Sequence, residues 1–236
     1  MSQGISKSIT GISKRIRQPL VWVDCEMTGL DHLKDRIMEI CCVITDGCSL
    51  KPLAIHETTL KMSTKEIDGM GEWCLRQHGA SGLTHRCLES TITLEQGQRE
   101  LTEFIRRWIP QKKMGVLSGN SVHMDRLFLL REYPAFINHL HYRIVDVSSI
   151  FEVCRRSNPK LLSQMPEKVK AHTARSDILE SILQLQWFEK AYLQVDPEFQ
   201  KEQEQVNIRD ELEKVYQEAT LINPFTRSSI AKTEEA

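Results

Sequence analysis

A short apolar strand that carries two acids constrains this chain more than any other segment. Residues 20–25 form a brief apolar run, and Thr28 and Gly29 supply a turn directly after it. Asp24 and Glu26 are two positions apart, so in a strand both side chains leave the same face. Carboxylates inside an apolar strand are costly unless a cation or water compensates their charge. The segment therefore predicts either a metal site in an interior strand or an acid pair on a solvated edge strand.

The apolar pattern along the rest of the chain predicts an α/β domain with a mixed sheet. Residues 36–45 and 53–60 have the composition of two further strands, and Asp46 and Gly47 supply a hairpin turn between them. Helical and strand patterns alternate after this hairpin. The elements we expect there are a helix over 65–78, a helix from about 94 that Pro110 ends, a strand over 115–118, a helix that carries Asp125, a strand over 143–147, a helix to about 156, a loop over 158–170 and a long helix from about 173.

The length of 236 residues suits one sizeable domain with a segment on either side of it. We expect a basic leader over residues 1–19, a folded domain over 20–194 and a charged extension over 195–236. Within the extension, the apolar side chains of Ile208, Leu212, Val215 and Tyr216 suit an amphipathic helix. The chain has no apolar run as long as a membrane span, so we expect no membrane partner.

The leader has the composition of a targeting segment. Residues 1–20 contain four Lys and Arg and no acid, and isoleucines recur among them at helical spacing. This composition is typical of a mitochondrial transit peptide, and we therefore expect a protein of the mitochondrion. The alternative is a disordered basic tail on a protein of the cytoplasm.

Charge is distributed unevenly along the chain. The formal net charge is -1, with a basic leader, ten acids against five bases in the extension, and a neutral middle. A long polynucleotide held along a basic stripe needs many phosphate-facing Lys and Arg side chains, which a neutral domain does not offer. A short oligonucleotide held by a few local contacts remains compatible with this charge.

Three further residues fit the chemistry of the acid pair, although each has an ordinary explanation by itself. Asp125 lies on a predicted helix, where most single acids are solvated. Asp177 lies early in the last long helix, where an acid also stabilises the positive end of the helix dipole, and His172 precedes that helix. Taken together, four acids and one histidine are the inventory for two hard divalent ions and a general base. That inventory predicts phosphodiester cleavage.

Several stretches of the chain, taken in order, are similar to those of a known enzyme family. They are WVDCEMTGLD, WCLRQHGASGL, GNSVHMDRLFL, HYRIVDVS and HTARSDILES. Over about residues 20–193 the chain resembles the oligoribonucleases, which belong to the DEDDh branch of 3′→5′ exonucleases. The resemblance implies that residues 20–194 are an exonuclease domain with a ribonuclease H-like fold. In this fold a mixed five-stranded sheet is flanked by helices, and an extra C-terminal helix would follow it here.

The resemblance also implies catalytic roles at the matching positions. Two Mg²⁺ or Mn²⁺ ions would be bound by the four acids Asp24, Glu26, Asp125 and Asp177. His172 would be the general base that activates the attacking water. The two ions would stabilise the attacking and leaving oxygens of the 3′-terminal phosphodiester.

Substrate contacts are implied at four more positions. Trp73 would form a wall against the bases, and Leu30 would wedge against the terminal base from the other side. Stacking on an aromatic face suits a substrate of any sequence. Ser121 and His78 would lie near the sugar or phosphate. The structural alternative for Trp73 is an ordinary core residue, because Trp is frequently buried.

The resemblance finally implies a homodimer. Tyr142 and Arg143 would reach across its interface and close the partner's site over the 5′ end of a very short RNA. The implied function is a 3′→5′ exoribonuclease that converts short single-stranded oligoribonucleotides, dinucleotides especially, to 5′-mononucleotides. One alternative is a related exonuclease that acts mainly on longer single-stranded RNA or DNA. The other is a non-catalytic relic that binds nucleotides.

Two positions depart from the family pattern. Cys25 stands where an aliphatic residue is usual, and Ser176 stands beside Asp177 where relatives often have an acid. Neither change removes a ligand or the base, so an active enzyme is still expected. We expect Ser176 to soften the electrostatics around the metals.

Overall fold

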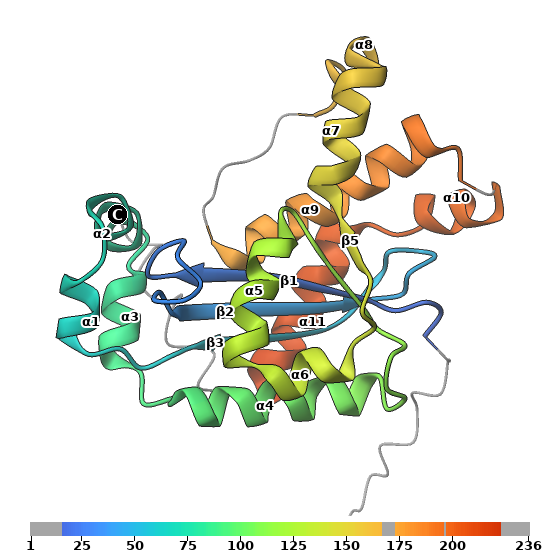
Figure 1. Cartoon of the computed structure of the whole chain (residues 1–236). Helices are drawn as coiled ribbons and strands as arrows, with labels where there is room; N and C mark the ends of the chain where they lie inside the picture. Colours follow the sequence, from blue (N-terminus) through green and yellow to red (C-terminus); the bar gives the residue numbers. More distant parts are fainter. Residues whose placement is uncertain (1–15, 167–172, 196, 223–236) are drawn as a thin grey trace, which may run out of the picture.

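A mixed five-stranded sheet forms the centre of the computed structural model, which describes residues 16–166, 173–195 and 197–222 (Figure 1). The strands are β1 (Leu20–Met27), β2 (Ile37–Thr45), β3 (Pro52–Thr59), β4 (Val116–Gly119) and β5 (Ile144–Asp146). Their order in the sheet is β3-β2-β1-β4-β5, with β1 antiparallel to β2 and parallel to β4. β1 lies between β2 and β4 in the sheet order, and Asp24 and Glu26 are half-buried, which favours the metal site over a solvated edge as the explanation of the acid pair.

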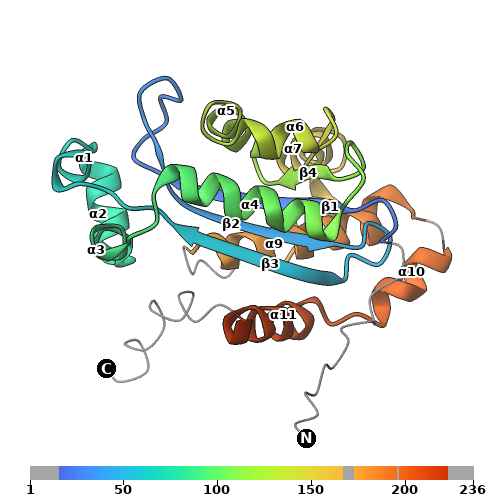
Figure 2. The same ribbon diagram turned by 90° about the horizontal axis from the view of Figure 1, so that it is seen from below.

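Helices from the first part of the chain cover one face of the sheet (Figure 2). The helices of this part of the chain are α1 (Thr64–Asp68), α2 (Glu72–Ala80), α3 (Leu83–Glu89), α4 (Leu94–Trp108), α5 (Val122–Glu132) and α6 (Pro134–His139). The short helices α1, α2 and α3 form a group at one end of the sheet (Figures 1 and 2). On this face Val21 and Val23 of β1 belong to one buried cluster with Leu101 of α4 and Phe128 of α5. Alternate residues of a strand face opposite sides, so Asp24 and Glu26 project from the other face.

The second face of the sheet is covered by helices from later in the chain. Trp22 of β1 and Val43 of β2 are buried there against Ile178 of α9 and Tyr216 of α11. The later elements are α7 (Val147–Ser157), α8 (Pro159–Leu162), α9 (Ala174–Phe188), the π-helix η1 (Glu189–Leu193), α10 (Pro197–Glu204) and α11 (Ile208–Ile222). None of the helices in the described residues is both long and apolar enough to cross a membrane.

The amphipathic helix predicted in the C-terminal extension is confirmed as α11. Its residues Ile208, Leu212, Val215 and Tyr216 are all buried, and they pack in the core on the same face as α9. Figure 2 shows α11 running below β3 on that face. The extension therefore contributes to the main core as far as this helix.

Two expected elements differ in detail from those observed. The helix expected over 65–78 is two helices, because Gly69 caps α1 and Gly71 is the N-cap of α2. The loop expected over 158–170 contains one helical turn, α8, which Asn158 caps by accepting the Leu161 N–H. The leader up to residue 15, His172 and residues 223–236 lie outside the described residues.

Candidate active site

Strand register places the acid pair in two rows of side chains that cross one face of the sheet. Asp24 pairs with Cys41 of β2, and Glu26 pairs with Glu39. The β2–β3 pairing extends both rows by one residue. The rows are Asp24–Cys41–Glu57 and Glu26–Glu39–Thr59. The face that carries the predicted metal ligands thus holds four acids on three adjacent strands.

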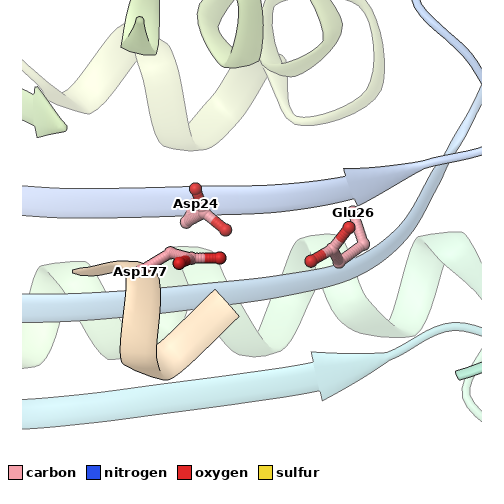
Figure 3. A group of neighbouring side chains, drawn as sticks. All are labelled: Asp24, Glu26 and Asp177. Carbon is pink, nitrogen blue, oxygen red and sulfur yellow. The ribbon is translucent and has the colours of Figure 1, made fainter. Parts of the chain in front are cut away.

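The first turn of α9 supplies a fifth acid. The Thr173 hydroxyl accepts the N–H of Ser176, and the Ser176 hydroxyl accepts the N–H of Thr173. This reciprocal cap fixes the start of the helix, and Asp177 follows it directly. One oxygen from each of Asp24, Glu26 and Asp177 lies within 4.8 Å of the others. Figure 3 shows these three side chains, which we call the acid cluster, around one space beside β1.

Asp125 lies next to the cluster but makes a different contact. β4 is paired with β1 only as far as Trp22, so the backbone of β1 beyond that point has no strand partner on this side. There the Cys25 N–H donates to Asp125 Oδ1 at 3.0 Å. Asp125 thereby ties α5 to β1, and its charge still reaches Asp24. Within the described residues, only the other three predicted ligands form the close group of oxygens.

The carboxylates raise one another's pKa. Burial is the largest cause of the upward shift of Asp24, and the charges of Asp125 and of the other cluster members add to it. The pKa of Glu26 rises to about 7, first through burial and then through the charge of Glu39. Burial also raises the pKa of Asp125 to about 7, although the bond from the Cys25 N–H opposes that shift. Without a cation, part of this site is therefore protonated at neutral pH.

The donor set fits hard divalent cations. Carboxylate oxygens are the ligands that Mg²⁺ and Mn²⁺ prefer, and the three cluster oxygens are close enough to share an ion. In the described part of the chain, no Lys or Arg forms an ion pair with Asp24 or Glu26, and the nearest ionisable nitrogen to Glu26 belongs to His78. Half-buried acids that repel one another need a cation to remain ionised together. The cluster residues could hold one.

Glu39 lies beside the cluster with partners of its own. Its Oε2 accepts from Arg86 Nη2 at 3.1 Å and from the Thr59 hydroxyl at 2.7 Å. Its charge is the second cause, after burial, of the raised pKa of Glu26. Glu39 thus shapes the electrostatics of the site although a cation of the protein already compensates it.

Glu57 occupies a similar position at the far end of the other row. Its Oε1 accepts from the Cys41 thiol at 3.6 Å. Burial raises the pKa of Glu57, and the charge of Arg175 in α9 opposes that rise. We call Glu39 and Glu57 the arginine-side acids. Sequence reasoning passed over both, although Glu39 is an acid in an apolar strand, the same signal that drew attention to Asp24.

His78 connects α2 to the end of β1. Its side chain is almost completely buried, and Nε2 donates to the Met27 carbonyl at 2.9 Å. Its Nδ1 lies 3.8 Å from Glu26 Oε2. The structure therefore places His78 against a cluster acid, and its predicted position near the sugar or phosphate stays a prediction.

Trp73 and Leu30 are exposed near the same end of the sheet. Trp73 lies in α2, which His78 ties to β1, and its side chain is 62% exposed. Leu30 lies in the loop after β1 and is 75% exposed. The alternative that Trp73 is a core residue is wrong. Both side chains are free to contact a ligand, and their predicted contacts with bases stay a prediction.

Ser121 begins α5 in a left-handed conformation, with φ of 51°. Its N–H donates to both Asp146 Oδ1 and Ser148 Oγ at 2.9 Å, and its hydroxyl is 3.2 Å from the Ser148 hydroxyl. This turn leads from β4 into the helix that carries Asp125. Its predicted contact with the sugar or phosphate is not tested by these bonds.

Tyr142 and Arg143 lie at the opposite end of the sheet from the cluster. Tyr142 is 69% exposed and stacks on His141. The guanidinium carbon of Arg143 lies over the Tyr142 ring, 5.5 Å from its centroid. In the strand register, Ile144 of β5 pairs with Leu117 of β4, and Leu117 pairs with Val21 of β1. Counted along parallel strands, Tyr142 is therefore roughly 16 Å from the level of Asp24. The pair lies too far along the sheet to contact the acid cluster of its own chain.

The predicted base, His172, lies outside the described residues. It directly precedes Thr173, the N-cap of α9, in the sequence. Ser176, the departure from the family pattern beside Asp177, has a structural task in the same cap, because its hydroxyl bonds the Thr173 backbone.

Comparison with known proteins identifies the family of this chain. The family described as Exonuclease matches residues 21–185. The chain is 54% identical over 190 residues to a mitochondrial oligoribonuclease of Saccharomyces cerevisiae, which covers 77% of this chain and 70% of that protein. It is 46% identical over 172 residues to a mitochondrial oligoribonuclease of Homo sapiens, with 72% of each chain covered.

The solved structure of E. coli exonuclease I with a dT13 oligonucleotide has a similar fold. The TM-score is 0.56 at 13% sequence identity, and the match covers 73% of this chain and 41% of that one. The mixed sheet and its flanking helices have a ribonuclease H-like fold, and the family match shows that the chain is an exonuclease of this fold. The sequence matches are more specific. This chain belongs to the oligoribonuclease family of exonucleases.

Proposed function

We propose that this chain is a divalent-metal-dependent 3′→5′ exoribonuclease that converts short single-stranded oligoribonucleotides to 5′-mononucleotides. The observation that carries the proposal is the convergence of Asp24, Glu26 and Asp177 on one face of an interior strand. Membership of the oligoribonuclease family gives the acids their context. The two divalent ions of the family, Mg²⁺ or Mn²⁺, would be held by the acid cluster, with Asp125 as a further ligand.

Bound divalent ions supply water activation and charge stabilisation in phosphodiester hydrolysis. The protein's part is to hold the carboxylates in place. β1 fixes Asp24 and Glu26, the cap of α9 fixes Asp177, and the Cys25 N–H fixes Asp125. His172, beside that cap in the sequence, would take the proton from the attacking water.

Substrate binding would use the exposed side chains near the end of β1. Trp73 offers an aromatic face for any base, and Leu30 an apolar wedge. His78 would approach the substrate from a position beside Glu26, because its Nδ1 lies 3.8 Å from Glu26 Oε2. Ser121 would contact the backbone of the RNA.

A homodimer would explain the position of Tyr142 and Arg143. Both are exposed, and they lie far along the sheet from their own cluster. In a dimer they would close the partner's site and restrict it to very short RNAs. The Tyr142→Ala protein should sediment as a dimer and hydrolyse dinucleotides more slowly than the wild type. Unchanged dinucleotide turnover in that dimer would contradict the lid.

We propose the mitochondrion as the compartment. The yeast and human relatives are named mitochondrial, and residues 1–20 carry basic side chains without an acid. A reporter fused to residues 1–20 should accumulate in mitochondria, and a diffuse cytoplasmic reporter would contradict the targeting role.

The experiment that tests the proposed activity compares two labelled RNAs, a dinucleotide and a twentymer, with Mn²⁺ and then with EDTA. We expect rapid, chelator-sensitive conversion of the dinucleotide and slow loss of the twentymer. Preference for the twentymer would indicate an exonuclease of longer strands. Binding without cleavage would indicate a nucleotide-binding relic.

A further inference from the structure

The C-terminal helix α11 contacts the turn of α9 that carries a metal ligand. The guanidinium of Arg175 lies over the ring of Tyr216, 3.7 Å from its centroid. Its Nη1 is 4.0 Å from a carboxylate oxygen of Glu213, one turn earlier in α11. Arg175 lies in the first turn of α9, two residues before Asp177. One side chain thus links the extension to the helix turn of the acid cluster.

The contact with Tyr216 is the main support that the described structure gives to Arg175. Nη1 of Arg175 is buried and has no hydrogen-bond partner among the described residues. On the sheet side, the charge of Arg175 acts on the half-buried Glu57 of β3. The guanidinium is therefore attracted both to the aromatic face of Tyr216 and to this acid.

Movement of Arg175 would be transmitted to Asp177. The cap between Thr173 and Ser176 encloses Arg175, the Asp177 N–H donates to the Thr173 carbonyl at 3.0 Å, and Ala174 and Ile178 on either side are buried in the core. A helix turn held in this way shifts as a unit rather than residue by residue. The cluster oxygens must stay within a narrow geometry to share an ion, so a small shift of Asp177 affects metal binding.

We propose that α11 positions the metal centre, with Tyr216 and Arg175 as positioning residues for Asp177. This inference rests on the proposed metal binding at the acid cluster and does not depend on which RNA is the substrate. The inference gives the charged C-terminal extension a function, because α11 then helps to hold the acids of β1 and α9 in the geometry that a metal ion requires.

The test is the affinity of the full chain for Mn²⁺ alone, measured by titration calorimetry. We expect Tyr216→Leu to weaken Mn²⁺ binding roughly three- to tenfold, because the cation–π contact is lost without a change in charge. Tyr216→Phe keeps the ring and should bind as the wild type does. Phe188→Leu, at the other end of α9, is the matched control: it removes buried ring volume and should leave Mn²⁺ affinity unchanged.

The Mn²⁺ affinity of a second variant separates the positioning role from a general loss of stability. Arg175→Met removes a cation near the acids, and on charge alone it should tighten Mn²⁺ binding. The positioning role predicts weaker binding instead, and no further weakening when Tyr216→Leu is added. If Tyr216→Leu does not fold, Arg175→Met carries the test. Unchanged or tighter Mn²⁺ binding in Arg175→Met would overturn the inference, whereas a wild-type protein that binds no Mn²⁺ would overturn the proposed metal function itself.

Discussion

Two sets of acids share one face of the sheet and differ in what compensates them. Asp24 and Glu26 begin two rows of side chains, and Glu57 and Glu39 lie in the same rows on neighbouring strands. Glu39 accepts a hydrogen bond from Arg86, and the charge of Arg175 opposes the rise in the pKa of Glu57. The charges that raise the pKa of Asp24, in contrast, are those of other carboxylates. In the described residues, Arg86 thus forms an ion pair with Glu39 of one set, whereas no Lys or Arg forms an ion pair with Asp24 or Glu26 of the other.

This difference separates structural acids from acids that hold a metal. A buried carboxylate is costly unless a cation compensates it, so an acid with arginine beside it needs no further explanation. Three carboxylates within 4.8 Å of one another destabilise the fold until a cation enters. Among the described residues, the close group of this kind is the acid cluster, which is where a divalent ion would be held.

The largest effect is expected from Asp24→Asn. This change keeps the shape of the side chain and removes a ligand, so kcat/KM on an RNA dinucleotide should fall by about a thousandfold or more. The metal-free variant should be at least as stable as the wild type, because the mutation relieves repulsion among buried acids. Thermal unfolding in EDTA checks this point. Retained turnover in a folded variant would contradict the assignment.

A smaller effect is expected when an arginine-side acid loses its partner. Arg86→Met leaves the mostly buried Glu39 without its cation and should lower the free energy of unfolding by about 2 kcal/mol. Adding Glu39→Gln removes the uncompensated charge and should restore part of this loss. Urea unfolding of the two single variants and the double variant measures the coupling. Simple additivity of the two effects would mean that Arg86 does not compensate Glu39.

The pH dependence of the metal-free protein should be smaller still. The pKa of Glu26 is about 7 in the folded state, against about 4.3 in the unfolded chain. Between these values the folded state binds more protons than the unfolded state, so stability falls as pH rises from about 5 to 8. The unscreened shift corresponds to about 3 to 4 kcal/mol, and solvent screening of this partly exposed carboxylate reduces the expected loss to about 1 to 2 kcal/mol.

Denaturant titrations in EDTA at several pH values measure this slope. Saturating Mn²⁺ should reverse its sign, because the ion binds the deprotonated acids. Glu26→Gln is the control and should reduce the slope of the metal-free profile, leaving the part that Asp24 and Asp125 contribute. A metal-free stability that rises over this window in the wild type and the variant alike would contradict the account.

Local patterns were sufficient to predict most of the fold. The apolar run of β1, the hairpin turn at Asp46 and the capped start of α9 are each encoded within a few residues, and all lie where expected. The same patterns placed Asp24 and Glu26 on one face. The extra C-terminal helix was visible from the spacing of its four buried apolar residues.

Features that depend on packing between distant segments were not predictable in this way. The pairing of Glu26 with Glu39 depends on the register across the long loop from 28 to 36, which no turn signal fixes. The contact of Arg175 with Tyr216 depends on where α11 packs, and amphipathicity gives a buried face without naming its neighbours. The division of Lys65–Ala80 into two helices also required the structure, since a glycine within a helical pattern does not always end a helix.

The most direct test uses the two acids at opposite ends of one row, Asp24 and Glu57. Titration calorimetry with Mn²⁺ would compare the wild type, Asp24→Asn and Glu57→Gln, two isosteric changes that each remove one negative charge from the same face. We expect Asp24→Asn to weaken Mn²⁺ binding more than about a hundredfold and Glu57→Gln to leave it within about threefold. Equal weakening by both changes, or none by Asp24→Asn, would contradict the distinction between metal-holding and arginine-side acids.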